Sequence, residues 1–212
     1  MRKKRRLPLA LIGGAFKNPD YLWPNHRTQH KAHLVGSAVD IVGNIQSRAE
    51  TIVNELTAAK SPVLLCGHSL GALIAYTAAQ IAPKGLVRGT ALVCPGMIGG
   101  NPNSFDYLEM VQLASNPFAA LRQMIASWPD RPESLSSLLE AACGQVAVGK
   151  KLKNVLVVSA AEDTITLPSR VREVADRVEG TLLEVGGGHD LPMSDQTGET
   201  LGLIAKHLRS HV

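Results

Sequence analysis

Six short apolar runs, separated by segments with helical spacing, constrain the fold of this 212-residue chain more than any other feature. Each run is apolar without a two-residue alternation, which is typical of strands buried on both faces of a parallel sheet. An alternation of such strands with helices predicts an α/β fold of three layers, with a mostly parallel sheet of about six strands. The runs are Leu7–Ile12, Ala32–Gly36, Pro62–Cys66, Thr90–Cys94, Val155–Ser159 and Thr181–Val185.

Helical stripes occupy most of the intervening chain. Ile45, Ile52 and Leu56 share one face of the first predicted helix. The segment Ser69–Ile81 is rich in alanine, as expected for a helix packed tightly against the middle of a sheet. Two further stripes follow the fifth and the sixth apolar runs, and the second of them ends the chain. They consist of Val171, Val174, Ala175 and Val178, and of Leu201, Leu203, Ile204 and Leu208.

Residues 97–150 break this rhythm because they contain no convincing strand. They hold most of the larger side chains of the chain, and four prolines divide them into short helical pieces. We interpret the chain as a single domain, residues 1–212, in which residues 97–150 form an inserted helical lid over the strand ends.

Charge and composition narrow the functional classes. The formal net charge is +4, and five positive charges lie in residues 2–6, so the remainder is close to neutral and predicts no nucleic-acid surface. The basic residues precede an apolar run, as in a signal peptide, but Pro8 interrupts it and no cleavage site follows, so a buried strand is the preferred interpretation. No stretch is apolar enough to predict a membrane span. Three cysteines without metal-ligand spacing indicate buried thiols and a cytoplasmic location.

The pentapeptide Gly67–Gly71, with sequence GHSLG, matches the pattern G-x-S-x-G between a predicted strand and a predicted helix. In that setting the glycines allow a sharp turn that exposes the Ser69 hydroxyl at a helix N-terminus. Free N–H groups there stabilise developing negative charge. Ser69 is therefore the candidate nucleophile.

A serine hydroxyl needs a base, and the base needs a carboxylate that orients it. His189 is the candidate base, since it follows three glycines after the last apolar run. Asp163 is the candidate carboxylate because it comes just after the fifth run, where parallel sheets place functional groups. Glu162 is the second choice and Asp190 the third.

These motifs resemble the α/β-hydrolase superfamily over nearly the whole chain, in the order Ser, Asp, His. The resemblance implies an oxyanion hole formed by the backbone N–H groups of Leu70 and Ala15. Many relatives have His-Gly before the oxyanion residue, whereas this chain has Gly13-Gly14, so Gly14 is the alternative second donor. The first two strands of the full family fold have no counterpart in the pattern.

Several residues are predicted to contact substrate beside this triad: Gly14, Trp23, His68 and Met97. Trp23 is expected at the pocket mouth. The side chain of His68 is expected to point away from the nucleophilic hydroxyl. His26, His30 and His33 form a weak metal-like cluster, but neighbouring prolines indicate a loop, and no metal is predicted. His26 is a further candidate for substrate contact.

The predicted function is hydrolysis of a carboxylic ester or thioester of a small, mostly apolar substrate through an acyl-enzyme, without a cofactor. A lyase or carbon–carbon bond hydrolase on the same scaffold is one alternative, since a fold does not fix its reaction. A non-catalytic ligand-binding module is the other. The expected assembly is a monomer or homodimer.

Overall fold

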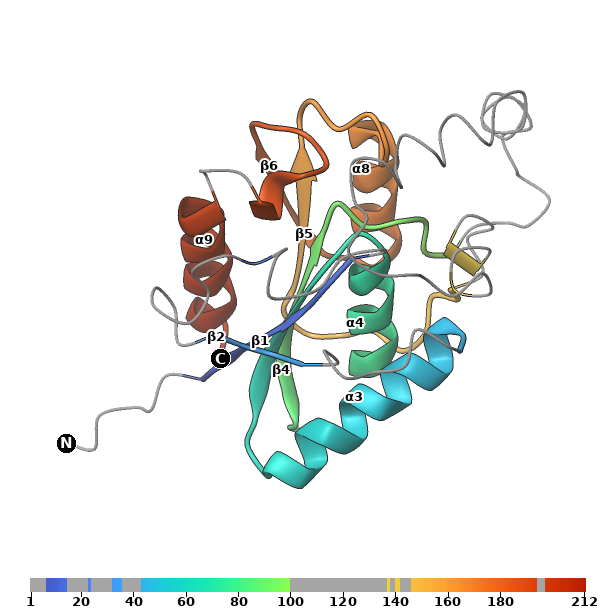
Figure 1. Ribbon diagram of the computed structural model, residues 1–212, viewed down its shortest axis with the longest axis vertical. Helices are drawn as coiled ribbons and strands as arrows, with labels where there is room; N and C mark the ends of the chain where they lie inside the picture. The colour runs from blue at the N-terminus through green and yellow to red at the C-terminus, as the bar shows by residue number, and fades with distance from the viewer. Residues whose placement is uncertain are drawn as a thin grey trace.

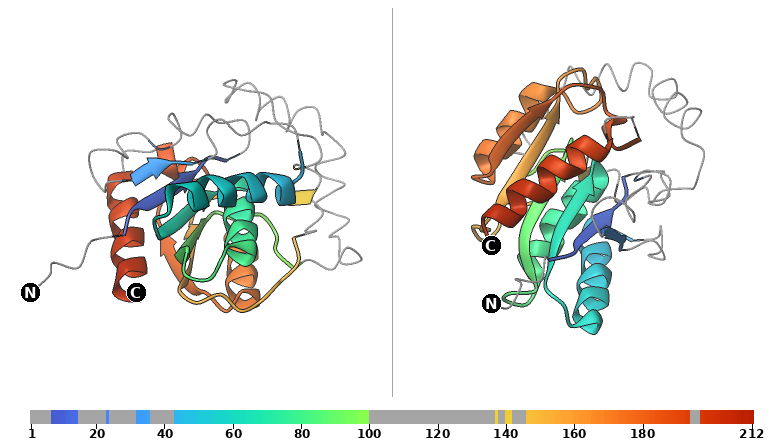
Figure 2. Two further views of the ribbon diagram at one scale, coloured as in Figure 1. Left: turned by 90° about the horizontal axis from the view of Figure 1, so that it is seen from below. Right: turned by 90° about the vertical axis from the view of Figure 1, so that its left-hand side faces the viewer.

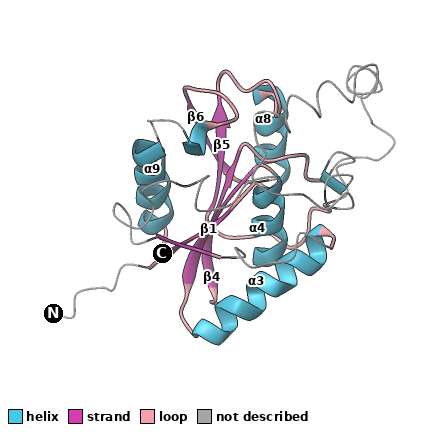
Figure 3. Ribbon diagram, viewed as in Figure 1, coloured by secondary structure: helices cyan, strands magenta, loops and turns pink. Residues whose placement is uncertain are grey.

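A six-stranded parallel sheet organises the protein in the computed structural model, which describes residues 7–14, 23, 32–35, 43–99, 137, 140–141, 146–193 and 197–212. The strand order is β2-β1-β3-β4-β5-β6, and every neighbouring pair is parallel. Figure 3 shows the strands fanned with a strong twist. The strands are β1 (Leu9–Ile12), β2 (Ala32–Leu34), β3 (Val63–His68), β4 (Val87–Val93), β5 (Val155–Ala160) and β6 (Thr181–Val185). The predicted sheet is thereby confirmed.

Side chains of the central strands alternate between two separate cores. Along β1, Ala10 and Ile12 join the larger core, whereas Leu9 and Leu11 join the core on the opposite face. All four residues are buried, because successive side chains of a strand point to opposite faces and both faces are covered. This double burial explains why the runs are apolar without alternation.

Helices cover the two faces unequally in the part of the chain that the structure describes. Three helices, α3 (Ile45–Ala59), α4 (Leu70–Ile81) and α8 (Pro168–Arg177), pack on the face of the larger core. The helix α9 (Thr197–Ser210) lies on the other face (Figures 1 and 2), and it contacts β4 and β5. This arrangement confirms the predicted three layers. A short 3-10 helix, η1 (Leu191–Met193), precedes α9.

The order of the strands reverses next to β1. The chain passes from β1 outward to β2, returns to β3 on the other side of β1, and then continues outward to β6. Ile12 at the end of β1 is paired with Gly67 near the end of β3, so the loops that follow the two strands start side by side. In open parallel sheets ligands bind at the carboxyl ends of the strands at such a reversal.

The two ends of the predicted lid meet in the structure. Ile98 and Val146 form an isolated parallel bridge, and the Gly99 N–H donates to the Val146 carbonyl oxygen at 2.6 Å. Most of residues 97–150 lie outside the described residues, so the lid remains a prediction. No described helix combines the length and the apolar composition that a bilayer crossing requires.

Candidate active site

The turn between β3 and α4 holds Ser69 in a conformation that few side chains adopt, with φ of 53° and ψ of −121°. Glycine is required on both sides of it. A Cβ atom on Gly67 would overlap the backbone carbonyl of Gly71, and one on Gly71 would overlap the carbonyl of Gly13. The glycines of G-x-S-x-G therefore let β3, α4 and the end of β1 approach one another around the serine.

Ser69, His189 and Asp163 are brought together from the ends of three strands. The Ser69 Oγ lies 3.0 Å from His189 Nε2, and His189 Nδ1 lies 2.8 Å from Asp163 Oδ2. Because a carboxylate only accepts, Nδ1 carries the proton and Nε2 is free to accept from the hydroxyl. The hydroxyl makes no capping bond to α4, and the His189 and Asp163 side chains are 5% and 0% exposed.

The Asp163 carboxylate is held by its own loop. Its Oδ1 accepts the backbone N–H groups of Ile165 and Thr166, each at 2.8 Å, and its Oδ2 accepts the Thr166 hydroxyl at 2.7 Å. Burial alone would raise the pKa of Asp163, but the bond from His189 and those from Thr166 lower the pKa to about 2. Glu162 and Asp190, the other candidates, have exposed side chains.

Two groups near the carboxylate have no counterpart in the sequence prediction. The Thr166 hydroxyl also lies 3.4 Å from His189 Nδ1, so it borders both partners of the hydrogen bond between His189 and Asp163. The spacing Asp163-x-x-Thr166 just before Pro168, the first residue of α8, is the sequence signal that identifies such a side chain-to-backbone turn. The thiol of Cys94, which follows β4, also lies near Asp163, and this carboxylate, after burial, helps to raise the pKa of the thiol.

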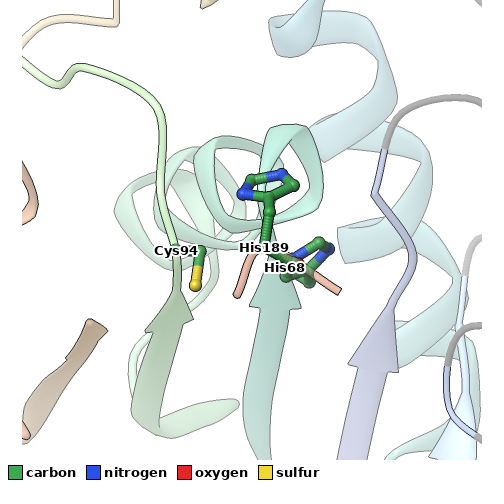
Figure 4. Close-up of side chains that lie close together, drawn as sticks. All are labelled: His68, Cys94 and His189. Atoms are coloured by element: carbon green, nitrogen blue, oxygen red, sulfur yellow. The ribbon is translucent and has the colours of Figure 1, made fainter. Parts of the chain in front are cut away.

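His68, Cys94 and His189 place potential metal-ligating atoms within 4.8 Å of one another. Figure 4 shows the two imidazole rings together, with Cys94 on the adjoining strand. However, both nitrogens of His189 are engaged by Ser69 and Asp163. Burial, with the nearby Asp163 carboxylate, raises the pKa of the Cys94 thiol and keeps it protonated. These three groups are therefore poorly suited to bind a metal while the hydrogen bonds are intact.

His68 is buried beneath the site, and its Nε2 lies 2.7 Å from the backbone carbonyl oxygen of His189. Its ring is 4.8 Å from the ring of His189 and meets the Trp23 ring edge-on. Burial, followed by the proximity of His189, lowers the pKa of His68 to about 3. The imidazole is therefore neutral near pH 7. The substrate contact predicted for His68 stays a prediction.

The remaining predicted residues lie in different places. Gly14 adjoins the nucleophile, since a Cβ atom on it would be 3.5 Å from Ser69 Cβ. Trp23 is only 1% exposed and donates its indole N–H to the Ile12 carbonyl oxygen, so it is a core residue instead of lining a pocket mouth. Met97 packs partly buried against the larger core. Leu70 begins α4, where helix geometry leaves its N–H without an intrahelical acceptor.

Some predicted positions fall outside the described residues, namely Ala15, His26 and His30. His33 is described, and its side chain is exposed on β2. The three-histidine cluster is therefore not tested by the structure.

The lowered pKa of His68 predicts acid destabilisation. The unfolded chain gains a proton on this side chain below about pH 6.5, whereas the folded protein does so only near pH 3. The free energy of unfolding should therefore fall as the pH decreases between these values, by up to about 1.4 kcal/mol per pH unit from this one group. Asp163 adds a further loss between its unfolded pKa and about pH 2.

Urea unfolding of the wild type and of His68→Gln at pH 7, 5 and 4 measures the contribution of His68. Every other titrating group is common to both proteins. The difference between their slopes of unfolding free energy against pH therefore isolates the contribution of His68. Equal slopes would contradict the lowered pKa.

Comparison with known proteins agrees with the architecture. Residues 21–202 match the alpha/beta hydrolase family, Abhydrolase_6. No curated protein matches the chain in sequence. Several solved structures share the fold at low sequence identity. A type II thioesterase from the yersiniabactin biosynthetic pathway, YbtT, has a TM-score of 0.68 at 16% identity, with 99% of this chain and 96% of that chain covered.

Two further structures are similar. The RedJ thioesterase of the prodiginine pathway in Streptomyces coelicolor has a TM-score of 0.64 at 19% identity, covering 96% of this chain and 86% of that chain. A monoacylglycerol lipase of Paleococcus ferrophilus has a TM-score of 0.61 at 16% identity, covering 97% and 95%. At such identities the structures establish the shared fold, and the family match covers most of the chain. The chain thus belongs to the alpha/beta hydrolase family.

Proposed function

We propose that this protein is a serine hydrolase that cleaves a carboxylic ester or thioester of a small, mostly apolar substrate. The observation that carries the proposal is the continuous hydrogen-bonded chain from the Ser69 hydroxyl through His189 to Asp163. A strained nucleophile, an acceptor nitrogen within 3.0 Å and a buried carboxylate behind it form the combination that acyl transfer requires.

In the proposed reaction, Ser69 Oγ attacks the substrate carbonyl carbon while its proton passes to His189 Nε2. Asp163 stabilises the resulting imidazolium. His189 then returns the proton to the leaving alcohol or thiol, which departs and leaves an acyl ester on Ser69. Water enters, gives a proton to His189 and attacks the acyl carbon. The bond between the acyl carbon and Ser69 Oγ then breaks, His189 returns the proton to this oxygen, and the acid leaves.

The oxyanion of each tetrahedral intermediate needs hydrogen-bond donors on the side of the nucleophile. The N–H of Leu70, at the first position of α4, is the proposed first donor. Ala15 is the proposed second donor, and Gly14 is the alternative. The close approach of Gly14 to the Ser69 side chain supports a donor from this loop.

The related structures support an acyl substrate, since those proteins are named as thioesterases and a monoacylglycerol lipase. Cys66 and Cys94 are free, buried thiols, which supports a reducing compartment, the cytoplasm, as the location.

The test is hydrolysis of p-nitrophenyl esters from acetate to dodecanoate, and of the matching acyl thioesters, by the wild type and Ser69→Ala. We expect Ser69→Ala to lower kcat by about 10³-fold or more, because the nucleophile is removed and only binding interactions remain. The chain length of the best substrate then measures the acyl pocket.

Ser159→Ala is the matched control, because Ser159 is a buried serine on β5 whose hydroxyl has no hydrogen-bond partner. It should hydrolyse the esters at the wild-type rate. Labelling of the wild type by a fluorophosphonate, lost in Ser69→Ala, provides a second readout. Equal hydrolysis by the wild type and Ser69→Ala, or no labelling of the wild type, would overturn the proposed function.

A further inference from the structure

A side chain-to-backbone hydrogen bond connects the turn that carries Ser69 to the loop that carries His189. His68 immediately precedes the nucleophile, and its Nε2 lies 2.7 Å from the carbonyl oxygen of His189, 121 residues away in the sequence. The candidate base is therefore fixed at its side chain by Ser69 and Asp163, and at its backbone by His68. We propose that His68 is a positioning residue that keeps His189 in register with Ser69, an inference that rests on the proposed function.

The bond determines the tautomer of His68. A carbonyl oxygen only accepts, so Nε2 must carry the proton, and in a neutral ring Nδ1 then has a lone pair and no proton. The ring is neutral near pH 7, since burial and the neighbouring His189 lower its pKa to about 3. A second positive charge 4.8 Å from His189 would oppose formation of the imidazolium in the proposed reaction. A neutral donor at His68 therefore holds the base without opposing its protonation.

The surroundings of Nδ1 show which part of the imidazole is used. Nδ1 is buried and has no hydrogen-bond partner. It faces Gly14, where a Cβ atom would lie 2.9 Å from it, and the Trp23 ring closes another side. An apolar residue in this position would leave no buried nitrogen unpaired, so packing alone favours leucine over histidine. The property that histidine adds is the Nε2–H bond to the His189 loop.

Gly14 and His189 come from the loops after β1 and β6, and His68 is the last residue of β3. The His68 ring lies against Gly14 and donates to the backbone of His189. It therefore couples the position of the Ser69 turn to the loops that carry Gly14 and His189. Acyl transfer is sensitive to small displacements of the base, because a shift of about 1 Å can cost about 10²-fold in rate. Loss of the bond should therefore reduce catalysis much more than substrate binding.

The experiment compares His68→Leu, which removes the donor, with His68→Gln, which keeps an N–H at a similar reach. Steady-state hydrolysis of the best p-nitrophenyl ester is measured at a temperature at which both variants are folded. We expect His68→Leu to lower kcat by about 10- to 100-fold with KM changed less than about twofold. His68→Gln should restore most of kcat.

Ile52→Ala is the control for a general loss of stability. Ile52 is buried in α3 and belongs to the larger core, and it lies in none of the segments that carry Ser69, Asp163 and His189. This variant should be destabilised in urea while keeping the wild-type kcat. A wild-type kcat in His68→Leu, equal losses in His68→Gln and His68→Leu, or an equal loss in Ile52→Ala would each overturn the positioning role.

Proton NMR provides a readout that needs no substrate. The downfield resonance of the His189 Nδ1–H bonded to Asp163, identified by its loss in His189→Ala, should be sharp in the wild type and His68→Gln. It should be broadened or lost in His68→Leu. An unchanged resonance in His68→Leu would overturn the inference. If Ser69→Ala instead hydrolyses esters like the wild type, the proposed function fails, and this resonance still decides whether His68 positions His189.

Discussion

Replacement of Asp163 by asparagine is expected to lower kcat for ester hydrolysis by about 10³- to 10⁴-fold without unfolding the protein. The asparagine side chain has nearly the same shape, but its NH₂ group can occupy the place of Oδ2. His189 Nδ1, now 2.8 Å from Oδ2, would then have to accept, which moves the imidazole proton to Nε2. A protonated Nε2 cannot take the proton of Ser69. Stopped-flow and steady-state hydrolysis of a p-nitrophenyl ester measure the effect.

The acidic neighbours of Asp163 and His189 supply matched controls. Glu162→Gln and Asp190→Asn remove one charge each at exposed side chains next to the same loops. Both variants should retain kcat within about twofold, because exposed charges in water have weak interactions. A large loss in Glu162→Gln, with little loss in Asp163→Asn, would instead identify Glu162 as the residue that orients the base.

Replacement of Gly71 by alanine is expected to lower the free energy of unfolding by about 3 kcal/mol, since overpacking a core in which backbone must move costs this much. The new methyl group would overlap the carbonyl of Gly13. Neither β1, which is paired on both sides, nor α4, which packs on β3 and β4, can move away easily. Urea unfolding followed by circular dichroism measures the change, and the remaining folded protein should hydrolyse esters poorly because the turn at Ser69 is displaced.

Gly186→Ala is the control for this substitution. A Cβ atom on Gly186 has open space around it, and its backbone is not in the left-handed region. Its free energy of unfolding should change by less than about 0.5 kcal/mol. An equally small effect of Gly71→Ala would show that the contact between α4 and β1 is looser than the structure indicates.

The sheet and the meeting of Ser69, His189 and Asp163 could be predicted because each depends on a local pattern. Strands that are buried on both faces appear in the sequence as short apolar runs. The sharp turn at Ser69 requires glycine at positions 67 and 71, which lie within two residues of it. Asp163 and its neighbour Glu162 both come just after a predicted strand. The structure separates these neighbours by burial, which a single sequence does not reveal.

The contacts that could not be predicted join loops that are distant in the sequence. Trp23 lies in a proline-bounded segment, which suggested a pocket mouth. It is instead buried, because its indole N–H reaches the last carbonyl of β1 while its ring fills the smaller core. The bond from His68 to the His189 backbone likewise depends on how two loops meet in three dimensions. No local pattern encodes such a meeting.

The position of β6 has a consequence for how the molecule opens. This strand lies at the edge of the sheet, pairs with β5 alone among the described strands, and leads directly into the loop that carries His189. Edge elements with half-exposed side chains separate from a protein at lower free energy than its centre. Partial opening at β6 would therefore carry His189 away while β1, β3 and α4 still hold Ser69. The alignment of the three groups is for this reason expected to be lost at a lower free energy than the domain that supports it.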